Sequence, residues 1–143
     1  MRGSFHPAWA VAGLLALAAP AGAQAPVVDA PTGQGLPGAG GVLIDIRTPR
    51  EAAATGRPKG AVPVPLQGDD MVFRNGFVAE VAAAAGNDKA RPVALIDADG
   101  RRAAFAAKLL ASQGFTAVLV VGEGMLGSNL GPGWMARGLP VER

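Results

Sequence analysis

Short apolar runs rich in β-branched residues alternate along this chain with segments of helical spacing. Residues 42–46, 92–96 and 116–121 form such runs, and residues 60–66 form a shorter one that contains two prolines. Apolar runs of this length are typical of strands that are buried on both faces of a parallel sheet. Alternating strands and helices therefore predict an α/β domain, with a mostly parallel central sheet flanked by helices on both faces. The two prolines place the 60–66 strand at an edge.

Start and stop signals define the expected helices. Thr48 is the expected N-cap of a helix that ends at Gly56, Pro49 lies at its first position, and Glu51 completes a capping box with Thr48. A second helix covers residues 77–85, where apolar side chains fall at helical spacing. A third begins at two arginines and ends at Gly114, and a short fourth helix follows Trp134. The apolar face expected on the third helix consists of Phe105, Ala106, Leu109 and Leu110.

The N-terminus has the pattern of a secretory signal peptide. Arg2 precedes an apolar run over residues 8–19, and small residues then offer a cleavage site near Ala23, with Ala25 as a second choice. A bilayer span needs about 20 apolar residues, so the run is too short for one; an uncleaved anchor is the alternative. We expect a Sec-type signal peptide over residues 1–23 and a periplasmic or secreted mature protein.

The residues after the leader divide into an arm and a domain. Residues 24–41 are rich in Ala, Pro and Gly and nearly uncharged, which indicates a mobile or loosely packed arm. Residues 42–143 are expected to form a single domain. The net charge is +2 and no cluster of Lys and Arg is interleaved with aromatics, so nucleic acid is not expected as a partner. No membrane partner is expected after leader cleavage.

The loop over residues 97–102 is the strongest candidate site. A buried strand stops at Asp97, and the chain passes through Ala98, Asp99 and Gly100 into a helix that begins with Arg101 and Arg102. Backbone N–H groups at a helix start carry partial positive charge, so such a loop favours an anion. Ligands of open α/β sheets bind beyond the carboxyl ends of the strands, where Asp45 and Arg47 are also expected.

The available side chains exclude several chemistries. The chain has no cysteine or tyrosine, and its single histidine, His6, lies in the leader. A mature chain without Cys and His excludes Cys–His and Ser–His–Asp catalysis and zinc sites of the usual kind. We expect no metal and no cofactor.

The motifs in this order resemble the rhodanese-like domains. The first segment, over residues 43–51, has the Asp-x-Arg and Glu of that family's N-terminal signature, and a Gly-Ala-x-x-(Ile/Val)-Pro-like strand follows at 60–66. The second, over residues 95–115, is similar to the family's active-site strand, loop and helix. Residues 138–141 also match a common C-terminal ending of rhodanese-like domains. The resemblance covers residues 41–142 and implies the rhodanese fold.

The resemblance also implies an activity that this chain cannot perform in the usual way. Rhodanese-like enzymes carry sulfane sulfur on a cysteine that opens the loop, and that position corresponds to Asp97. A persulfide requires a polarisable thiolate, whereas a carboxylate reproduces only the negative charge. The resemblance therefore implies an inactive family member, in which Asp97 fills the cradle as an internal plug. Backbone N–H bonds to the carboxylate are expected to lower its pKa and keep it ionised.

Alternatives remain for several of these residues. Asp97 could be a nucleophile, although nothing nearby supplies a base or Mg²⁺ beyond Asp99. The two arginines could hold an anionic ligand, but neutralisation of Asp97 and Asp99 is the simpler interpretation. Asp45 and Arg47 are expected to pin loops rather than to catalyse. Trp134 and Met125 could expose an apolar patch, though core or lid positions are the commoner outcome.

Residues 122–127 match G-x-G-x-x-G after a strand, the fingerprint of a dinucleotide-binding turn. Too little chain remains for the further strand and acid that such a fold needs, so we interpret the segment as a turn-rich loop bordering the site. The expected function is that of an exported, non-catalytic binding or accessory module, or of a small-anion sensor. The expected partner is an unidentified protein or an anion such as thiosulfate, sulfate or phosphate. The alternative is an enzyme of the thiosulfate sulfurtransferase type.

Overall fold

Five parallel strands form the central sheet of the protein. The structure is a computed structural model that describes residues 23–143. The strands lie in the order β1 (Val27–Val28), β6 (Val118–Val121), β5 (Val93–Ile96), β2 (Val42–Asp45) and β4 (Val62–Pro63), and every neighbouring pair is parallel. The predicted parallel sheet is confirmed, and β4 lies at an edge as its prolines require.

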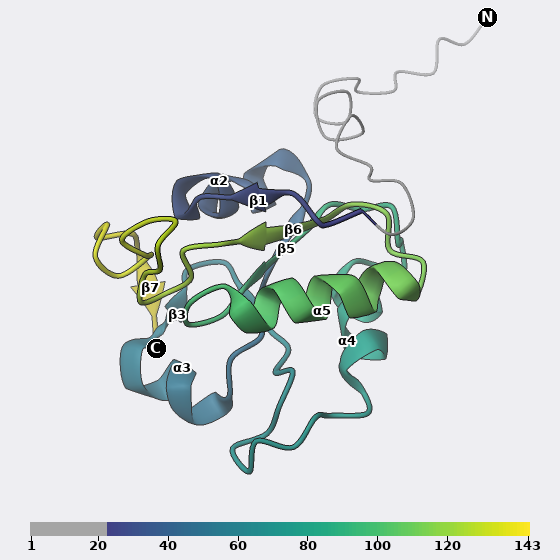
Figure 1. Ribbon diagram of the computed structural model, residues 1–143, viewed down its shortest axis with the longest axis horizontal. Coiled ribbons are helices and arrows are strands. Elements are labelled where there is room, and N and C mark those ends of the chain that lie inside the picture. Colours follow the sequence, from purple (N-terminus) through teal and green to yellow (C-terminus); the bar gives the residue numbers. More distant parts are fainter. Residues whose placement is uncertain (1–22) are drawn as a thin grey trace, which may run out of the picture.

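Helices cover both faces of this sheet (Figure 1). One face packs against α4 (Phe77–Ala84) and α5 (Arg101–Ser112), while α2 (Ala30–Gly35) and the 3-10 helix η1 (Pro37–Ala39) lie on the other side. The alternation of side chains along each strand supplies both cores, because successive residues point to opposite faces. On β5, for example, Val93 and Leu95 join the core on the α5 side, and Ala94 and Ile96 join the other.

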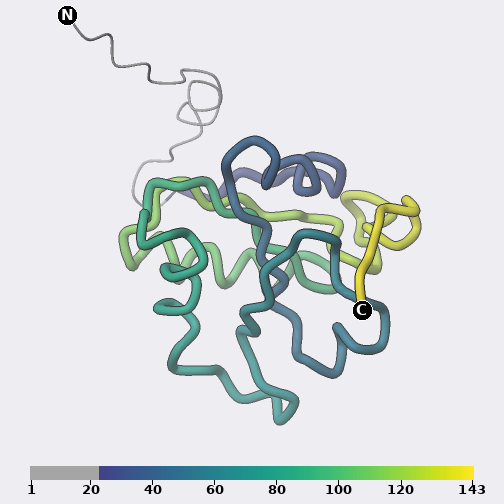
Figure 2. Tube along the Cα trace, turned by 180° about the vertical axis from the view of Figure 1, so that it is seen from behind, coloured from purple at the N-terminus to yellow at the C-terminus, as the bar shows by residue number. Residues whose placement is uncertain are grey.

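Local sequence signals set the ends of α3 (Pro49–Thr55) as predicted. The side chain of Thr48 accepts a hydrogen bond from the N–H of Glu51, and Glu51 accepts one from the N–H of Thr48, which completes the capping box. Gly56 ends the helix. Immediately after it, β3 (Arg57–Pro58) pairs antiparallel with β7 (Val141–Glu142), so the C-terminal segment lies beside the end of α3 (Figure 2).

The prediction that residues 24–41 form a mobile or loosely packed arm is wrong. Strand β1 extends the sheet beside β6, and Asp29 caps α2 by accepting the N–H of Thr32 at 2.9 Å. Ala30 and Leu36 are buried in the core, so the segment belongs to the domain. At Gly33 the absence of a side chain allows close packing against the sheet, since a Cβ there would lie 2.8 Å from the side chain of Val121.

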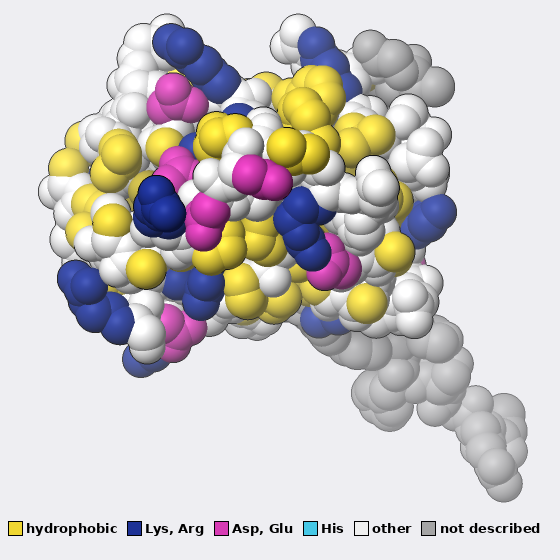
Figure 3. Space-filling view, turned by 90° about the horizontal axis from the view of Figure 1, so that it is seen from below, with side chains coloured by type: hydrophobic (Ala, Val, Ile, Leu, Met, Phe, Trp, Pro, Cys, Tyr) yellow, Lys and Arg dark blue, Asp and Glu magenta, His cyan; other side chains and the backbone are white. Residues whose placement is uncertain are grey.

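The apolar face of α5 differs from the expected one by a rotation of the helix. Its buried residues are Ala103, Ala106, Ala107 and Leu110. Phe105 is exposed instead, and its ring lies 5.5 Å from that of Phe73. Alanines and Leu110 make up the face of α5 that packs on β5 and β6. Figure 3 shows exposed hydrophobic side chains of this kind lying among acidic and basic ones, with neither sign of charge dominating that face.

The short C-terminal helix expected after Trp134 is replaced by turns. Trp134 and Met125 are fully buried, which confirms the core interpretation, and the indole Nε1 donates to the carbonyl of Pro140 at 3.0 Å. The expected signal peptide lies almost entirely outside the described residues. No helix within residues 23–143 is long and apolar enough to cross a membrane.

Candidate functional site

Two aspartates meet at the carboxyl edge of the sheet. Asp45 ends β2 and pairs in register with Ile96 of β5, so the next residue, Asp97, leaves the same edge beside it. The strand order reverses between β2 and β5, because the chain runs from β2 to β4 and later from β5 to β6. Ligands of open α/β sheets bind at such a reversal. The structure therefore brings the predicted loop and the predicted Asp45 and Arg47 together where a site is expected.

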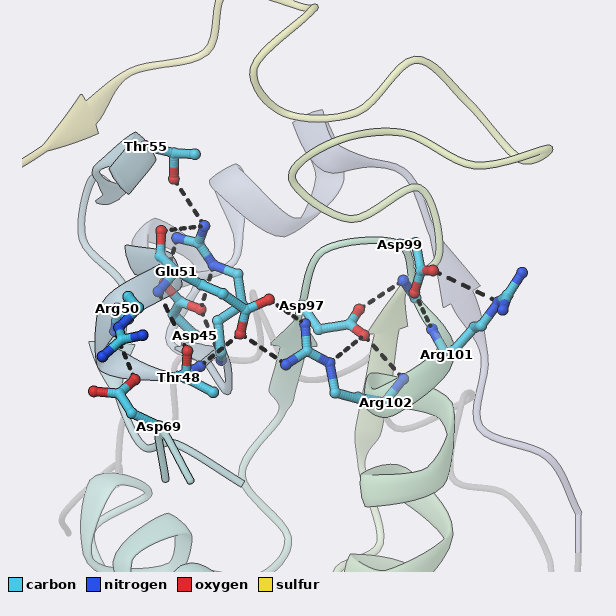
Figure 4. A network of polar contacts seen from close by, with 12 residues as sticks. Asp45, Thr48, Arg50, Glu51, Thr55, Asp69, Asp97, Asp99, Arg101 and Arg102 are labelled. Atoms are coloured by element: carbon cyan, nitrogen blue, oxygen red, sulfur yellow. Dashed lines mark hydrogen bonds and ion pairs between the residues drawn. The ribbon is translucent and has the colours of Figure 1, made fainter. Parts of the chain in front are cut away.

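The carboxylate of Asp97 lies inside its own loop (Figure 4). One oxygen accepts the backbone N–H of Gly100 at 2.6 Å, and the other accepts the N–H of Arg102 at 2.9 Å. The Nε of Arg102 lies 3.6 Å from the same carboxylate, which is fully buried. The donors at the start of α5 that would face a bound anion are thus already directed at a side chain of the protein.

The pKa of Asp97 shifts in the direction opposite to the expected one. Burial raises it, and the hydrogen bonds from Gly100 and Arg102 and the charge of Arg102 lower it by less than burial raises it. The expectation of a lowered pKa counted the backbone donors correctly but omitted the desolvation of a fully buried carboxylate.

The two arginines of the loop have different partners. Arg101 is exposed, and its Nε lies 3.5 Å from Asp99. Arg102 instead forms a bidentate pair with Glu51, with N–O distances of 2.8 and 2.6 Å, in addition to its contact with Asp97. This pairing lowers the pKa of Glu51 to about 2, because the bidentate guanidinium outweighs the effect of burial. Neutralisation within the loop, as expected, thus accounts for Arg101 but only in part for Arg102.

Asp45 and Arg47 hold the backbone together next to the loop. The guanidinium of Arg47 donates to both carboxylate oxygens of Asp45, at 3.0 and 2.8 Å, and both side chains are buried. Arg47 also donates to the carbonyl of Gly56 and to the hydroxyl of Thr55. The pair therefore ties the end of β2 to the end of α3, and its buried donors are directed at the protein itself. This agrees with the expected structural role.

Comparison with known proteins decides the family. The family model described as "Rhodanese-like domain" matches residues 32–128 of this chain. The chain belongs to the rhodanese-like domain family. The sequence resemblance is thereby confirmed, and this rhodanese-like domain contains no cysteine.

Solved structures with the same fold come from several bacteria. Rv0390 from M. tuberculosis is 25% identical, with a TM-score of 0.65 over 84% of this chain and 98% of that one. A polysulfide-sulfur transferase homodimer from Wolinella succinogenes is also 25% identical, with a TM-score of 0.60 over 82% of this chain and 77% of that one. The Alr3790 protein from Anabaena sp. is 21% identical, with a TM-score of 0.60 over 80% of this chain and 90% of that one, and it shares the fold. No curated protein matches the chain.

A further buried acid organises the loop that borders the site of this rhodanese-like domain. The carboxylate of Glu123 accepts the N–H of Ala30 at 2.8 Å, the N–H of Gly133 at 2.7 Å and the Nε of Arg137 at 2.7 Å. Burial raises the pKa of Glu123, but these donors together hold it below its ordinary value. Sequence reasoning missed this role, since the three donors lie far from Glu123 along the chain or in turns.

The segment over residues 122–127 borders the loop as predicted. The N–H groups of Met125 and Leu126 donate to the carbonyls of Asp97 and Ala98, at 2.8 and 2.9 Å. The segment thus supports the loop from behind through its backbone. Among the residues that the structure describes, no group of three or more His, Cys, Asp or Glu side chains is arranged to hold a metal ion.

Proposed function

We propose that this protein is a non-catalytic member of its family, a binding or accessory module whose former catalytic cradle is filled by Asp97. The observation that carries the proposal is the position of the Asp97 carboxylate, which accepts the N–H groups of Gly100 and Arg102 within the loop. A carboxylate in that place has no means of holding sulfane sulfur. The correspondence of Asp97 with the family's cysteine remains part of this proposal.

Sulfur transfer is the alternative, and the W. succinogenes protein is named for that activity. It requires a thiolate, and the chain contains no cysteine. An anion sensor is less well supported by the geometry than a binding module. The two backbone donors that would hold thiosulfate, sulfate or phosphate are engaged by Asp97, and the Arg102 guanidinium is engaged by Glu51.

A thiosulfate–cyanide assay tests the proposal. We expect the unmodified protein to form thiocyanate at the background rate, because nothing replaces the thiolate. Asp97→Cys is expected to acquire turnover and, after treatment with thiosulfate alone, to gain about 32 Da as a persulfide. Asp97→Asn is the matched control, since it keeps the size of the side chain without a thiol and should remain inactive. Turnover by the unmodified protein would contradict the proposal.

We further propose that the protein is exported, with a Sec-type signal peptide over residues 1–23. The pattern of a basic residue, a short apolar run and small residues before Gln24 supports this. Expression of the full chain in a bacterium with a periplasm should place a shortened protein in the periplasmic fraction. N-terminal sequencing is expected to begin at Gln24; an intact Met1 in the recovered protein would refute cleavage.

A further inference from the structure

A cavity of about 600 Å³ lies beside the candidate loop, over the carboxyl end of β6. Residues 99–101 and the first turn of α5 form one wall, β1 and β6 form the floor, and the turn over residues 127–130 forms the other wall. The volume is within the range of small-molecule sites, about 300–1,000 Å³. These are the two segments, the loop and the Gly-rich stretch after β6, that the sequence predicted to border the site.

This cavity is distinct from the crevice at the reversal of strand order. That crevice lies between β2 and β5, and the fully buried carboxylate of Asp97 and the Glu51–Arg102 pair occupy it. The open space lies one strand further along the sheet, over β6. Asp99 and Arg101, which line it, lie on the opposite side of Asp97 from Glu51 (Figure 4). A ligand in this cavity would therefore need neither the catalytic position of the family nor its anion cradle.

Apolar side chains converge on the floor of the cavity. Val27 and Leu130 are 58% and 62% exposed, although both line it. They meet over Gly122, because a Cβ there would lie 2.5 Å from Val27 and 2.7 Å from Leu130. Ala104 and Val120 continue the apolar lining. Two large aliphatic groups that converge on an open cavity favour a ligand with an apolar body, since covering them removes their surface from water.

The rim of the cavity carries one charge of each sign. The side chain of Arg101 is 90% exposed and that of Asp99 is 42% exposed. Their closest approach is 3.5 Å, which is looser than the 2.6 and 2.8 Å contacts of the neighbouring Arg102 with Glu51. A loose, exposed pair of this kind contributes little to stability. One oxygen of Asp99 also accepts the backbone N–H of Arg101 at 3.1 Å, so the guanidinium of Arg101 and the other oxygen of Asp99, Oδ2, remain available to a ligand. An anion alone would be repelled by Asp99, and a cation alone by Arg101.

We propose that this cavity binds a zwitterionic α-amino acid with a large apolar side chain. The ligand carboxylate would bind Arg101, its ammonium group would bind Asp99, and its side chain would cover Val27 and Leu130. The two charges of an α-amino acid are joined through one carbon, which suits two protein charges that lie side by side. This inference rests on the proposed function, in that it names the ligand class of a module that binds without catalysing.

Isothermal titration calorimetry with three matched probes tests the ligand class. L-Phenylalanine carries both charges, 3-phenylpropanoate lacks the ammonium group, and phenethylamine lacks the carboxylate. We expect saturable binding of L-phenylalanine at millimolar concentration or below, and at least about tenfold weaker binding of each analogue, because each leaves one rim charge without its partner. Equal affinity for 3-phenylpropanoate would overturn the zwitterion assignment, and the absence of saturable binding up to about 10 mM would overturn the site.

Matched variants locate the binding. Ala104→Leu fills the cavity from α5 and should weaken L-phenylalanine about tenfold or more, whereas Ala111→Leu, exposed on the same helix away from the cavity, should have no effect. Arg101→Gln should weaken L-phenylalanine but not phenethylamine, and Lys108→Gln is its control. Unchanged binding in Ala104→Leu would place any binding elsewhere.

The ligand class and the non-catalytic role can be refuted independently of each other. If no probe binds and the thiosulfate assay is also negative, the ligand class is wrong while the non-catalytic module stands. If the unmodified protein turns over thiosulfate, the non-catalytic module is wrong, whatever the titration shows.

Discussion

Gly100→Ala is expected to lower the free energy of unfolding by about 3–5 kcal/mol, the largest effect of any change considered for this protein. Gly100 precedes α5 with φ of +92°, a conformation that L side chains rarely adopt. A Cβ there would also lie 2.3 Å from the carbonyl oxygen of Gly122, which is backbone and has no freedom to turn aside. Backbone strain and collision therefore add at one position.

Gly60→Ala separates these two effects. Gly60 has φ of +84°, but a Cβ there would have no atom within 4 Å, so only the strain remains. We expect a loss of about 1 kcal/mol for this control. Thermal unfolding measures both, with each kcal/mol lowering Tm by about 3–5 °C in a domain of this size. Equal losses in the two variants would show that the contact between the loop and Gly122 does not constrain the fold.

Arg102→Met is expected to lower the free energy of unfolding by about 2–3 kcal/mol at neutral pH. The substitution keeps an unbranched apolar stem but removes the guanidinium charge that faces both Glu51 and the buried Asp97. A buried carboxylate without a positive charge beside it is costly, even though Asp97 keeps its two backbone N–H donors in the variant. The partial exposure of Arg102 and Glu51 reduces the effect below that of a fully buried pair. Arg101→Met is the matched control. Its side chain is 90% exposed, so the change should stay within about 0.5 kcal/mol.

The cost of Arg102→Met should depend on pH. The folded-state pKa of Glu51 is about 2, below its ordinary value of 4.5, so its pairing stabilises the unmodified protein above pH 4.5 and is lost as the pH falls toward 2. The pKa of Asp97 is raised, and the loss of Arg102 removes one of the groups that oppose this rise. Asp97 therefore takes up a proton more readily in the variant, and the neutral side chain no longer carries the cost of a buried charge.

Protonation of Glu51 and protonation of Asp97 both reduce the cost of losing Arg102 at low pH. The difference in unfolding free energy between Arg102→Met and the unmodified protein should be largest at neutral pH and should shrink as the pH falls below 4.5. Denaturant unfolding at several pH values measures it. A difference that stays constant from pH 7 to pH 3 would mean that Arg102 acts through packing that Met does not reproduce rather than through its charge.

Local sequence signals predicted the structure correctly where it depends on residues that are neighbours along the chain. The capping box at Thr48 and Glu51 formed as predicted, and the apolar run at 93–96 became a central strand. The carboxyl ends of β2 and β5 placed Asp45 and Asp97 together, as strand alternation predicts. The family motifs identified the fold for the same reason, since each is a short segment whose spacing is set by a turn or a helix start.

Predictions failed where packing overrode composition. The Ala- and Gly-rich residues 24–41 read as a mobile arm, yet small side chains are what allow α2 to lie close to the sheet, with Gly33 against Val121. Phe105 was predicted to be a core residue because it is hydrophobic. The face of α5 that packs on β5 and β6 consists instead of alanines and Leu110. Helical spacing predicts that one face is apolar without saying how much room that face will have.

The sequence by itself determined that this chain forms an α/β rhodanese-like domain and that no thiolate is present for sulfur transfer, because both follow from residue types and their local spacing. Only the tertiary structure decided the partner of Arg102. The sequence shows Glu51 only as a capping residue. The fold brings it to Arg102, which lies 51 positions further along the chain. The same folding step raised the pKa of Asp97, because burial is a property of the surrounding atoms and not of the loop sequence.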